Sequence, residues 1–199
     1  MNVLITGGNG DLAKSIAKNL VSLGYCVLSP ERDQLDVTDA LSVENYFKDR
    51  EFDIVINAAG TLYSSLIADS DPSEWIKDIQ VNLIGTYLIC RQAVVANKKT
   101  AIFNIASTAA FNSYPDWTSY CASKAGVVTL SKGMHKDGYN VCVICPGAIE
   151  TKIRKNLKIN NTNVLSIAEG VKPIIDAIVN KKFGEVVIYR KNEYRVEIL

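Results

Sequence analysis

The chain has 199 residues, of which 48% are hydrophobic and 22% charged, and its formal net charge is +1. This length suits one domain and is too short for two ordinary ones, so we expect a single domain over residues 1–199. The balanced charge gives no reason to expect nucleic acid or an anionic membrane as a partner, and the basic segment 152–158 is interpreted as a solvated face.

The cysteines and the single histidine do not indicate a disulfide framework or a metal site. The five cysteines are an odd number within apolar runs, which is typical of reduced core thiols. Cys142 and Cys145 have CxxC spacing, but they lie in a predicted strand, where residues three apart point to opposite faces. His135 is predicted to lie exposed near a helix end. No leader and no apolar run of membrane-spanning length is apparent, so the expected location is the cytoplasm.

A glycine-rich turn follows the first predicted strand, Asn2 to Thr6. The sequence from Thr6 to Ala13 is TGGNGDLA, and a helical pattern runs from about Asp11 to Leu23. In this setting glycines let the backbone approach a diphosphate, and the helix N-terminus offers unpaired N–H groups. The alternative is a tight turn without a ligand.

The second predicted strand, Tyr25 to Ser29, leads to Glu31 and Arg32. In a dinucleotide fold the end of this strand meets the adenosine ribose. An acidic group there suits the free 2′-hydroxyl of NAD, whereas an arginine suits the 2′-phosphate of NADP through bidentate contacts. The pair leaves both cofactors open, with a preference for NADP from Arg32.

The middle of the chain continues the alternation. A helix capped by Thr38 or Asp39 is predicted to about Arg50, and strand Asp53 to Asn57 runs into small residues that would let a ligand lie against the backbone. A long helix is then predicted from Pro72 to about Asn97, with Asn82 in its interior, where asparagine normally faces solvent.

Tyr120 and Lys124 lie four residues apart in the next predicted helix, so their side chains share one face. A phenol has a reference pKa of roughly 10, and a nearby ammonium favours its phenolate, so such a tyrosine can exchange a proton with a substrate oxygen. Alone, the pair also fits a surface tyrosine beside a solvated lysine.

The remaining predicted elements complete a repeating pattern of strand and helix. This alternation predicts an α/β fold, a Rossmann-type doubly wound parallel sheet with helices on both faces. The later predicted elements are strand 101–106, the Tyr120 helix ended by Gly138, strand 140–144, helix 167–180, strand 185–189 and a charged tail.

With these landmarks placed, the chain resembles the short-chain dehydrogenase/reductase family over nearly its whole length. The matching pieces stand in family order at the ends of the appropriate elements. They are the turn from Thr6 to Gly10, Asp36, Asn57 to Gly60, Asn82, Ser107, Tyr120 with Lys124, and Pro146 with Gly147.

The resemblance implies an NAD(P)-dependent oxidoreductase that interconverts a carbonyl and an alcohol. Tyr120 would be the acid/base, Ser107 would bind the substrate oxygen, Lys124 would bind the nicotinamide ribose and lower the Tyr120 pKa, and Asn82 would distort its helix and hold a relay water. The implied cofactor contacts are Thr6, Gly7, Asn9, Gly10, Asp11 and Leu12 at the glycine turn; Glu31, Arg32, Asp36 and Val37 at the adenosine; Asn57, Ala58, Ala59 and Gly60 along the cofactor; and Tyr120, Lys124, Pro146, Gly147, Ile149 and Thr151 towards the nicotinamide.

Some features depart from the commoner family pattern. The glycines align as Gly7, Gly10 and Ala13, as in the sugar-nucleotide branch, and the stretch 35–39 resembles dTDP-4-dehydrorhamnose reductase. Asp11 places a negative charge at the helix start, and the segment after Gly147 is short, which implies a small or exposed substrate. The alternatives are a cofactor-binding sensor without catalysis and a sugar-nucleotide epimerase or reductase. A small-molecule partner and a homodimer or homotetramer are expected.

Overall fold

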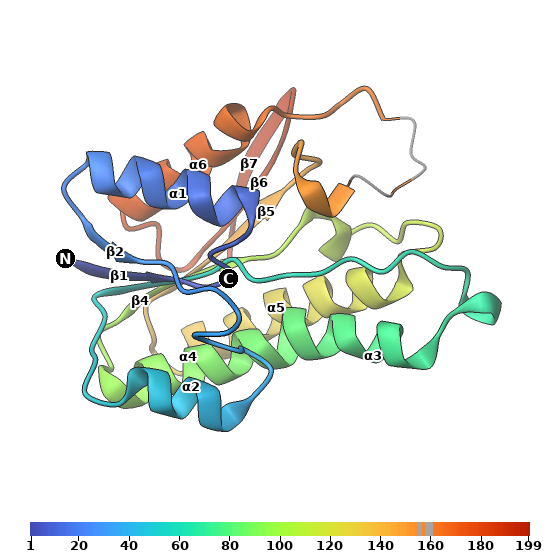
Figure 1. The fold of residues 1–199 in the computed structure, drawn as a ribbon. Helices are drawn as coiled ribbons and strands as arrows, with labels where there is room; N and C mark the ends of the chain where they lie inside the picture. The colour runs from blue at the N-terminus through green and yellow to red at the C-terminus, as the bar shows by residue number, and fades with distance from the viewer. Residues whose placement is uncertain (155–156, 158–160) are drawn as a thin grey trace.

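Seven strands form one sheet in the order β2-β1-β3-β4-β5-β6-β7 (Figure 1). This computed structural model describes residues 1–154, 157 and 161–199. Strands β1 to β6 pair in parallel, and β7 is antiparallel to β6. The strands are β1 Asn2–Ile5, β2 Cys26–Leu28, β3 Ile54–Asn57, β4 Ala101–Ile105, β5 Val141–Pro146, β6 Glu185–Arg190 and β7 Glu193–Ile198.

Helices cover both faces of the sheet (Figure 1). Helices α1 and α6 lie on one face, and α2, α4 and α5 lie on the other. Helix α3 comes just before α4 in the chain and extends beyond its N-terminal end. Their bounds are α1 Asp11–Ser22, α2 Ala40–Phe47, α3 Pro72–Ile79, α4 Gly85–Ala96, α5 Thr118–Lys136 and α6 Ile167–Val179, and short 3-10 turns span Ile67–Asp69, Thr108–Ala110 and Lys152–Arg154.

Two apolar layers form the core because the central strands are buried on both sides. Phe103 and Ile144 pack with α1 and α6, whereas Val55 and Ile102 pack with α2 and α4. Such near-continuous apolar strands are typical of a parallel sheet covered on both faces. The predicted α/β fold with a Rossmann-type sheet is therefore confirmed.

The tail of the chain departs from the expectation. Residues expected to form a charged tail make strand β7, whose side chains alternate between charged and apolar. Tyr194 pairs with Tyr189 and Val196 pairs with Val187 across the ladder. The high density of charge in this segment concealed a period-2 pattern, which is why the sequence interpretation missed an edge strand.

The predicted long helix is present, but it is not uniform. A π-helical segment, Gln80–Ile84, joins α3 to α4. By length and composition alone, the combined stretch Pro72–Ala96 could cross a membrane. Core helices of soluble proteins meet the same criterion. Here the stretch packs against α2, α5 and β3 and turns the buried residues Asp78, Asn82 and Thr86 towards the protein.

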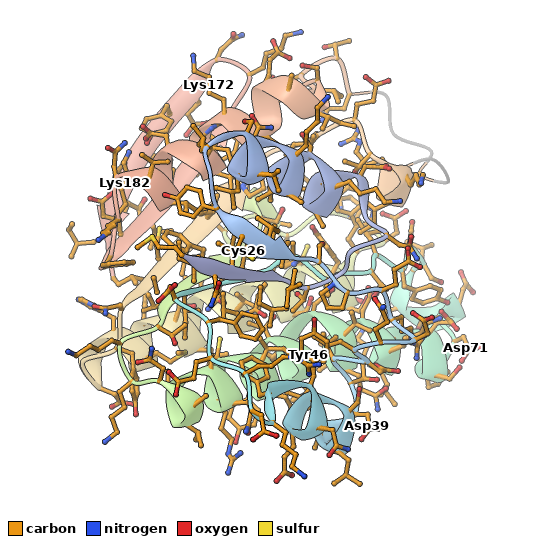
Figure 2. All side chains as sticks on the ribbon, turned by 60° about the vertical axis from the view of Figure 1, so that its left-hand side comes forward. Cys26, Asp39, Tyr46, Asp71, Lys172 and Lys182 are labelled. Carbon is orange, nitrogen blue, oxygen red and sulfur yellow. The ribbon has the colours of Figure 1, made fainter. Side chains whose placement is uncertain are left out.

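The cysteines are free thiols, but not all are in the core. Cys90, Cys142 and Cys145 are buried, with Cys142 and Cys145 in different core clusters, as expected for opposite faces. Cys26 is instead exposed on edge strand β2 (Figure 2). His135 is half-buried rather than exposed, because its ring lies against Gly184. Within the basic segment, residues 155, 156 and 158 lie outside the described residues.

The glycine turn gives a direct test of the backbone packing between β1 and β2. A Cβ atom on Gly8 would lie 2.2 Å from the Ser29 carbonyl oxygen, whereas one on Gly133 in α5 would meet nothing within 4 Å. We expect Gly8→Ala to lower the free energy of unfolding by about 1–3 kcal/mol through overpacking. Gly133→Ala, the matched control, should raise it by about 0.5–1 kcal/mol. Urea denaturation of both variants measures the difference, and equal stabilities would contradict this packing.

Candidate active site

The functional side chains gather where the parallel strands end. Gly7 follows β1, Ala58 follows β3, Ser107 follows β4 and Gly147 follows β5. The carboxyl ends of parallel strands lie at one edge of the sheet, where open α/β sheets bind ligands. Helix α5 brings Tyr120 and Lys124 to the same edge.

Ser107, Tyr120 and Lys124 meet at the end of β4. The Ser107 hydroxyl lies near enough to the Tyr120 phenol to lower its pKa. The Lys124 Nζ lies 5.6 Å from the centroid of the Tyr120 ring and donates a hydrogen bond of 2.9 Å to the carbonyl of Ile105. Lys124 is buried, and the edge of Trp117 packs on Tyr120 with 6.0 Å between ring centroids. The structure thus brings together the hydroxyl, phenol and ammonium that the sequence singled out.

Burial dominates the proton affinities of this group. Loss of hydration raises the pKa of Tyr120 to about 12, although the Ser107 hydroxyl lowers it, and the charge of Asp78 adds to the increase. Burial also lowers the pKa of Lys124 to about 8, against the opposing effects of Cys145 and Asp78. Burial is the largest cause of the Tyr120 shift. The expectation that Lys124 lowers the Tyr120 pKa stays a prediction.

Asn82 lies in the π-helical segment and is fully buried, unlike the solvent-facing asparagine that is usual inside a helix. Its Oδ1 accepts a hydrogen bond from the Thr61 N–H at 2.9 Å, and its Nδ2 donates to the Thr61 carbonyl at 2.9 Å and to Ser123 Oγ at 3.0 Å. The helix distortion that the family resemblance implied is present. Asn82 joins the segment after β3 to α5.

The backbones of the glycine turn and of the segment after β3 lie close together. Gly7 has a φ of +76°, and a Cβ there would lie 2.8 Å from Ala59 Cα. Thr6 Oγ1 accepts hydrogen bonds from the N–H groups of Ala58 and Ala59, both at 3.1 Å. A Cβ on Gly60 would lie 3.1 Å from Asn82 Oδ1 and 3.7 Å from Lys124 Nζ. These close approaches, with the start of α1 beside them, fit a dinucleotide that lies along the backbone.

Asp11 occupies the first turn of α1, as expected, but it is not the N-cap, which is Gly10. Its carboxylate accepts a hydrogen bond of 2.7 Å from the Lys152 N–H, and its other oxygen lies 3.4 Å from Lys152 Nζ. The ammonium offsets part of the charge that would disfavour a diphosphate. This contact also joins the glycine turn to the segment after β5.

Glu31 and Arg32 have different partners at the end of β2. Glu31 accepts a hydrogen bond of 2.7 Å from Asn9 of the glycine turn. Arg32 Nε donates to Asp36 at 3.0 Å, and the Arg32 side chain is 76% exposed. Asp36 also accepts hydrogen bonds from Thr38, and its pKa is lowered by these bonds and by Arg32 despite the opposing effect of burial.

Several residues predicted to contact the cofactor direct their side chains to other parts of the protein. The Asn57 amide is buried and donates to Asn104 and Cys90, so only its backbone is placed to line a ligand. Val37 packs against Gly85, and Ile149 packs beneath Gly170. Leu12 is half-buried against the core at the start of α1, the Gly147 N–H donates to the Tyr189 carbonyl after Pro146, and Thr151 donates to the Ile149 carbonyl. Their contacts with a cofactor stay predictions.

Sequence reasoning missed the buried polar side chains that support this group. Asp78 lies one helical turn before Asn82, and Ser119 and Ser123 flank Tyr120. Asp78 is buried and accepts hydrogen bonds from Thr61, Tyr63 and Ser119. The spacing of Asp78 and Asn82 on one helix face was the available signal, but an aspartate in a helix whose neighbours are Lys77 and Glu74 resembles part of an exposed face.

Comparison with known proteins identifies the family. The family model for short chain dehydrogenases matches residues 32–162, which is more than half of the chain. The chain belongs to the short-chain dehydrogenase/reductase family. It is 28% identical over 184 residues to a 3-oxoacyl-(acyl-carrier-protein) reductase of Haemophilus influenzae, covering 77% of this chain and 76% of the relative. The corresponding reductase of Chlamydia trachomatis is 30% identical over 172 residues, with 81% and 69% covered.

The fold agrees with a solved member of the same class. A small-chain dehydrogenase in complex with NADPH superposes with a TM-score of 0.86 at 19% identity, covering 96% of this chain and 97% of that one. Its similarity concerns the fold. Together with the family match, these findings establish this protein as an NAD(P)-dependent oxidoreductase with a small-molecule substrate.

Proposed function

We propose that this protein interconverts a small carbonyl compound and its alcohol within one domain that holds both cofactor and substrate. The observation that carries the proposal is the buried Lys124 ammonium, which lies 5.6 Å from the centroid of the Tyr120 ring at the end of β4, where Ser107 follows the strand. A carbonyl oxygen gains negative charge during reduction, and two hydroxyl donors stabilise and protonate it.

The cofactor supplies or accepts the hydride at its nicotinamide when it is bound. Tyr120 donates a proton to the substrate oxygen in reduction and removes it in oxidation, while the Ser107 hydroxyl orients that oxygen. Lys124 holds positive charge beneath the phenol and binds the ribose, and Asn82 fixes Thr61 and supports a relay water. The residues proposed to hold the cofactor are Gly7, Asn9 and Gly10 at the diphosphate; Arg32, Asp36 and Val37 at the adenosine; Ala58 to Gly60 along its length; and Pro146, Gly147 and Thr151 at the nicotinamide.

The relatives suggest the substrate probe. The two reductases reported above act, by name, on 3-oxoacyl groups carried by a protein. We therefore choose acetoacetyl-coenzyme A, a short 3-oxoacyl thioester, as the first substrate, with aldoses as the second group because stretch 35–39 resembles a sugar-nucleotide enzyme. A protein that binds cofactor but reduces none of these would support the sensor alternative.

We also propose a homodimer or homotetramer formed through the long helix. Ile76, Ile84, Tyr87 and Val95 on α3, the π-helical segment and α4 are exposed. Apolar side chains that recur along one helix are suited to a contact with a second copy. Sedimentation velocity of the wild-type protein would decide between a monomer and these assemblies.

Tyr120→Phe tests the acid/base assignment. Because the variant lacks the transferable proton, we expect kcat with acetoacetyl-coenzyme A to fall by about 10²–10⁴-fold. The cofactor Kd should stay within about twofold, since the ring remains in place. The control is Tyr25→Phe, which lies on the α1 face of the sheet. Loss of absorbance of the reduced nicotinamide measures the rate, and wild-type turnover in Tyr120→Phe would refute the role.

The pH dependence of reduction should report Lys124. Its pKa is about 8, and that of Tyr120 is about 12, so the ammonium loses its proton first as pH rises. We expect kcat/KM for reduction to be constant below about pH 8 and to fall about tenfold per pH unit above it. Lys124→Met should show a lower plateau without this decline. A decline that persists unchanged in Lys124→Met would assign it to another group.

Arg32→Ala tests the preference for NADP. A hydrogen bond to a charged group is worth about 1.5–3 kcal/mol, so the loss of even one contact to the 2′-phosphate should raise the Kd for oxidised NADP by about 10–100-fold. NAD binding should change little, because Glu31 is held by Asn9 rather than by Arg32. Calorimetry with both oxidised cofactors, and with exposed Arg91→Ala as control, measures the effect. Equal losses for the two cofactors would count against the assignment.

A further inference from the structure

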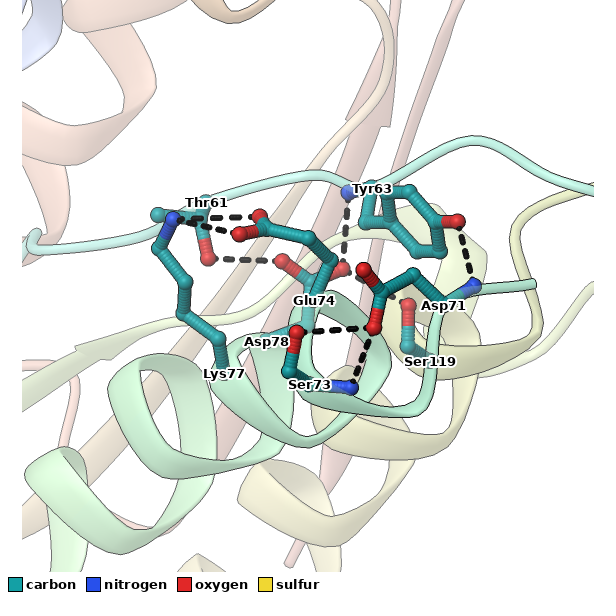
Figure 3. Close-up of polar contacts among 8 residues, drawn as sticks. All are labelled: Thr61, Tyr63, Asp71, Ser73, Glu74, Lys77, Asp78 and Ser119. Atoms are coloured by element: carbon teal, nitrogen blue, oxygen red, sulfur yellow. Dashed lines mark hydrogen bonds and ion pairs between the residues drawn. The ribbon is translucent and has the colours of Figure 1, made fainter.

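A single buried carboxylate lies behind the catalytic group. Asp78 is only 1% exposed and accepts three hydrogen bonds: from Thr61 Oγ1 at 2.6 Å, from the Tyr63 N–H at 2.8 Å and from Ser119 Oγ at 2.7 Å (Figure 3). A buried carboxylate is costly unless its oxygens are satisfied by donors. These three bonds therefore strongly favour one arrangement of the segments that supply them.

The three donors come from two segments of the chain, the segment after β3 and the first turn of α5. Thr61 directly follows Gly60, whose backbone lies close to Lys124, and Tyr63 comes two residues after Thr61. Ser119 directly precedes Tyr120 in α5. Thr61 is also the residue whose N–H and carbonyl are held by Asn82. Asp78 thus links the segment after β3 to the helical turn that carries the phenol.

More exposed hydrogen bonds extend this link along the boundary between α3 and α5. The Asp71 N–H donates to Tyr63 Oη at 2.8 Å, and Trp75 Nε1 donates to Thr118 Oγ1 at 3.0 Å. The neighbouring Lys77 pairs instead with Glu74, and both are partly exposed (Figure 3). The three donors to Asp78 are neutral, so its negative charge is not cancelled by them.

We propose that Asp78 is a positioning residue that holds residues 61–63 against the first turn of α5 and thereby places the Tyr120 phenol for proton transfer. The proposal rests on the function assigned to Tyr120 above. The negative charge of Asp78 also raises the pKa values of Tyr120 and Lys124 in α5. The other titratable groups that act on this pair are Cys121 in α5 and Cys145 in β5.

Two variants separate the bonds of Asp78 from its charge. Asp78→Asn keeps the shape but removes the charge and turns one acceptor into a donor that faces other donors. Ser119→Ala keeps the charge and removes one bond beside Tyr120. Asp71→Asn is the matched control, because Asp71 is an exposed N-cap of the same helix and asparagine also caps well.

The first measurement is the pH profile of acetoacetyl-coenzyme A reduction. We expect Asp78→Asn to lower kcat by about 10–100-fold, to leave the Kd for NADP within about twofold, and to move the decline assigned to Lys124 to lower pH, because a charge that favours the ammonium is removed. Ser119→Ala should lower kcat less and leave the pH of that decline unchanged. Wild-type kcat together with an unmoved decline in Asp78→Asn would overturn the proposal.

Two further measurements keep the test decisive. If Asp78→Asn does not fold, the Thr61→Val and Ser119→Ala double variant retains the charge, and wild-type kcat in that variant would overturn the positioning role. If no probe is reduced, amide hydrogen exchange replaces turnover: Tyr63 N–H should exchange at least about tenfold faster in Asp78→Asn than in Asp71→Asn, and equal rates would overturn the link. Wild-type turnover in Tyr120→Phe would instead refute the proposed function, which distinguishes the two failures.

Discussion

The buried ammonium of Lys124 is the constraint on which the site depends. Its hydrogen bond to the carbonyl of Ile105 attaches α5 to the end of β4, one element away in sequence but adjacent in space. Because a buried charge is costly without partners, this attachment fixes the rotation of α5. With the helix so placed, the Tyr120 phenol meets the hydroxyl of Ser107, which stands two residues beyond Ile105.

A second set of polar contacts completes the site from the opposite side. The π-helical segment turns Asn82 inwards, where its amide holds Thr61 and Ser123, and Asp78 holds the same strand-to-helix connection one turn earlier. Neither side chain belongs to an apolar core, yet both are fully enclosed. Their hydrogen bonds therefore act as geometric constraints on the backbone near Gly60 and Tyr120.

The sequence predicted the architecture well because local chemistry and the overall fold agree there. The glycine turn after β1, the strand that ends at Asn57 and the Tyr120 helix all carry strong local patterns, and each occurs close to its expected place. The misses share a cause: β7 pairs through a charged edge, and Asp78 is satisfied by residues 15 to 41 positions away. Such long-range pairings leave no local period in the sequence.

Strand β7 also affects whether the edge of the sheet can pair with a strand of another molecule. It ends the sheet, and an end strand offers unpaired amides and carbonyls to any other extended chain. Glu193, Arg195 and Glu197 alternate along it, with Arg195 within 3.3 Å of both acids. At the opposite end, β2 has only three residues. A short strand at one edge and alternating charges at the other both disfavour the addition of a further strand to the sheet.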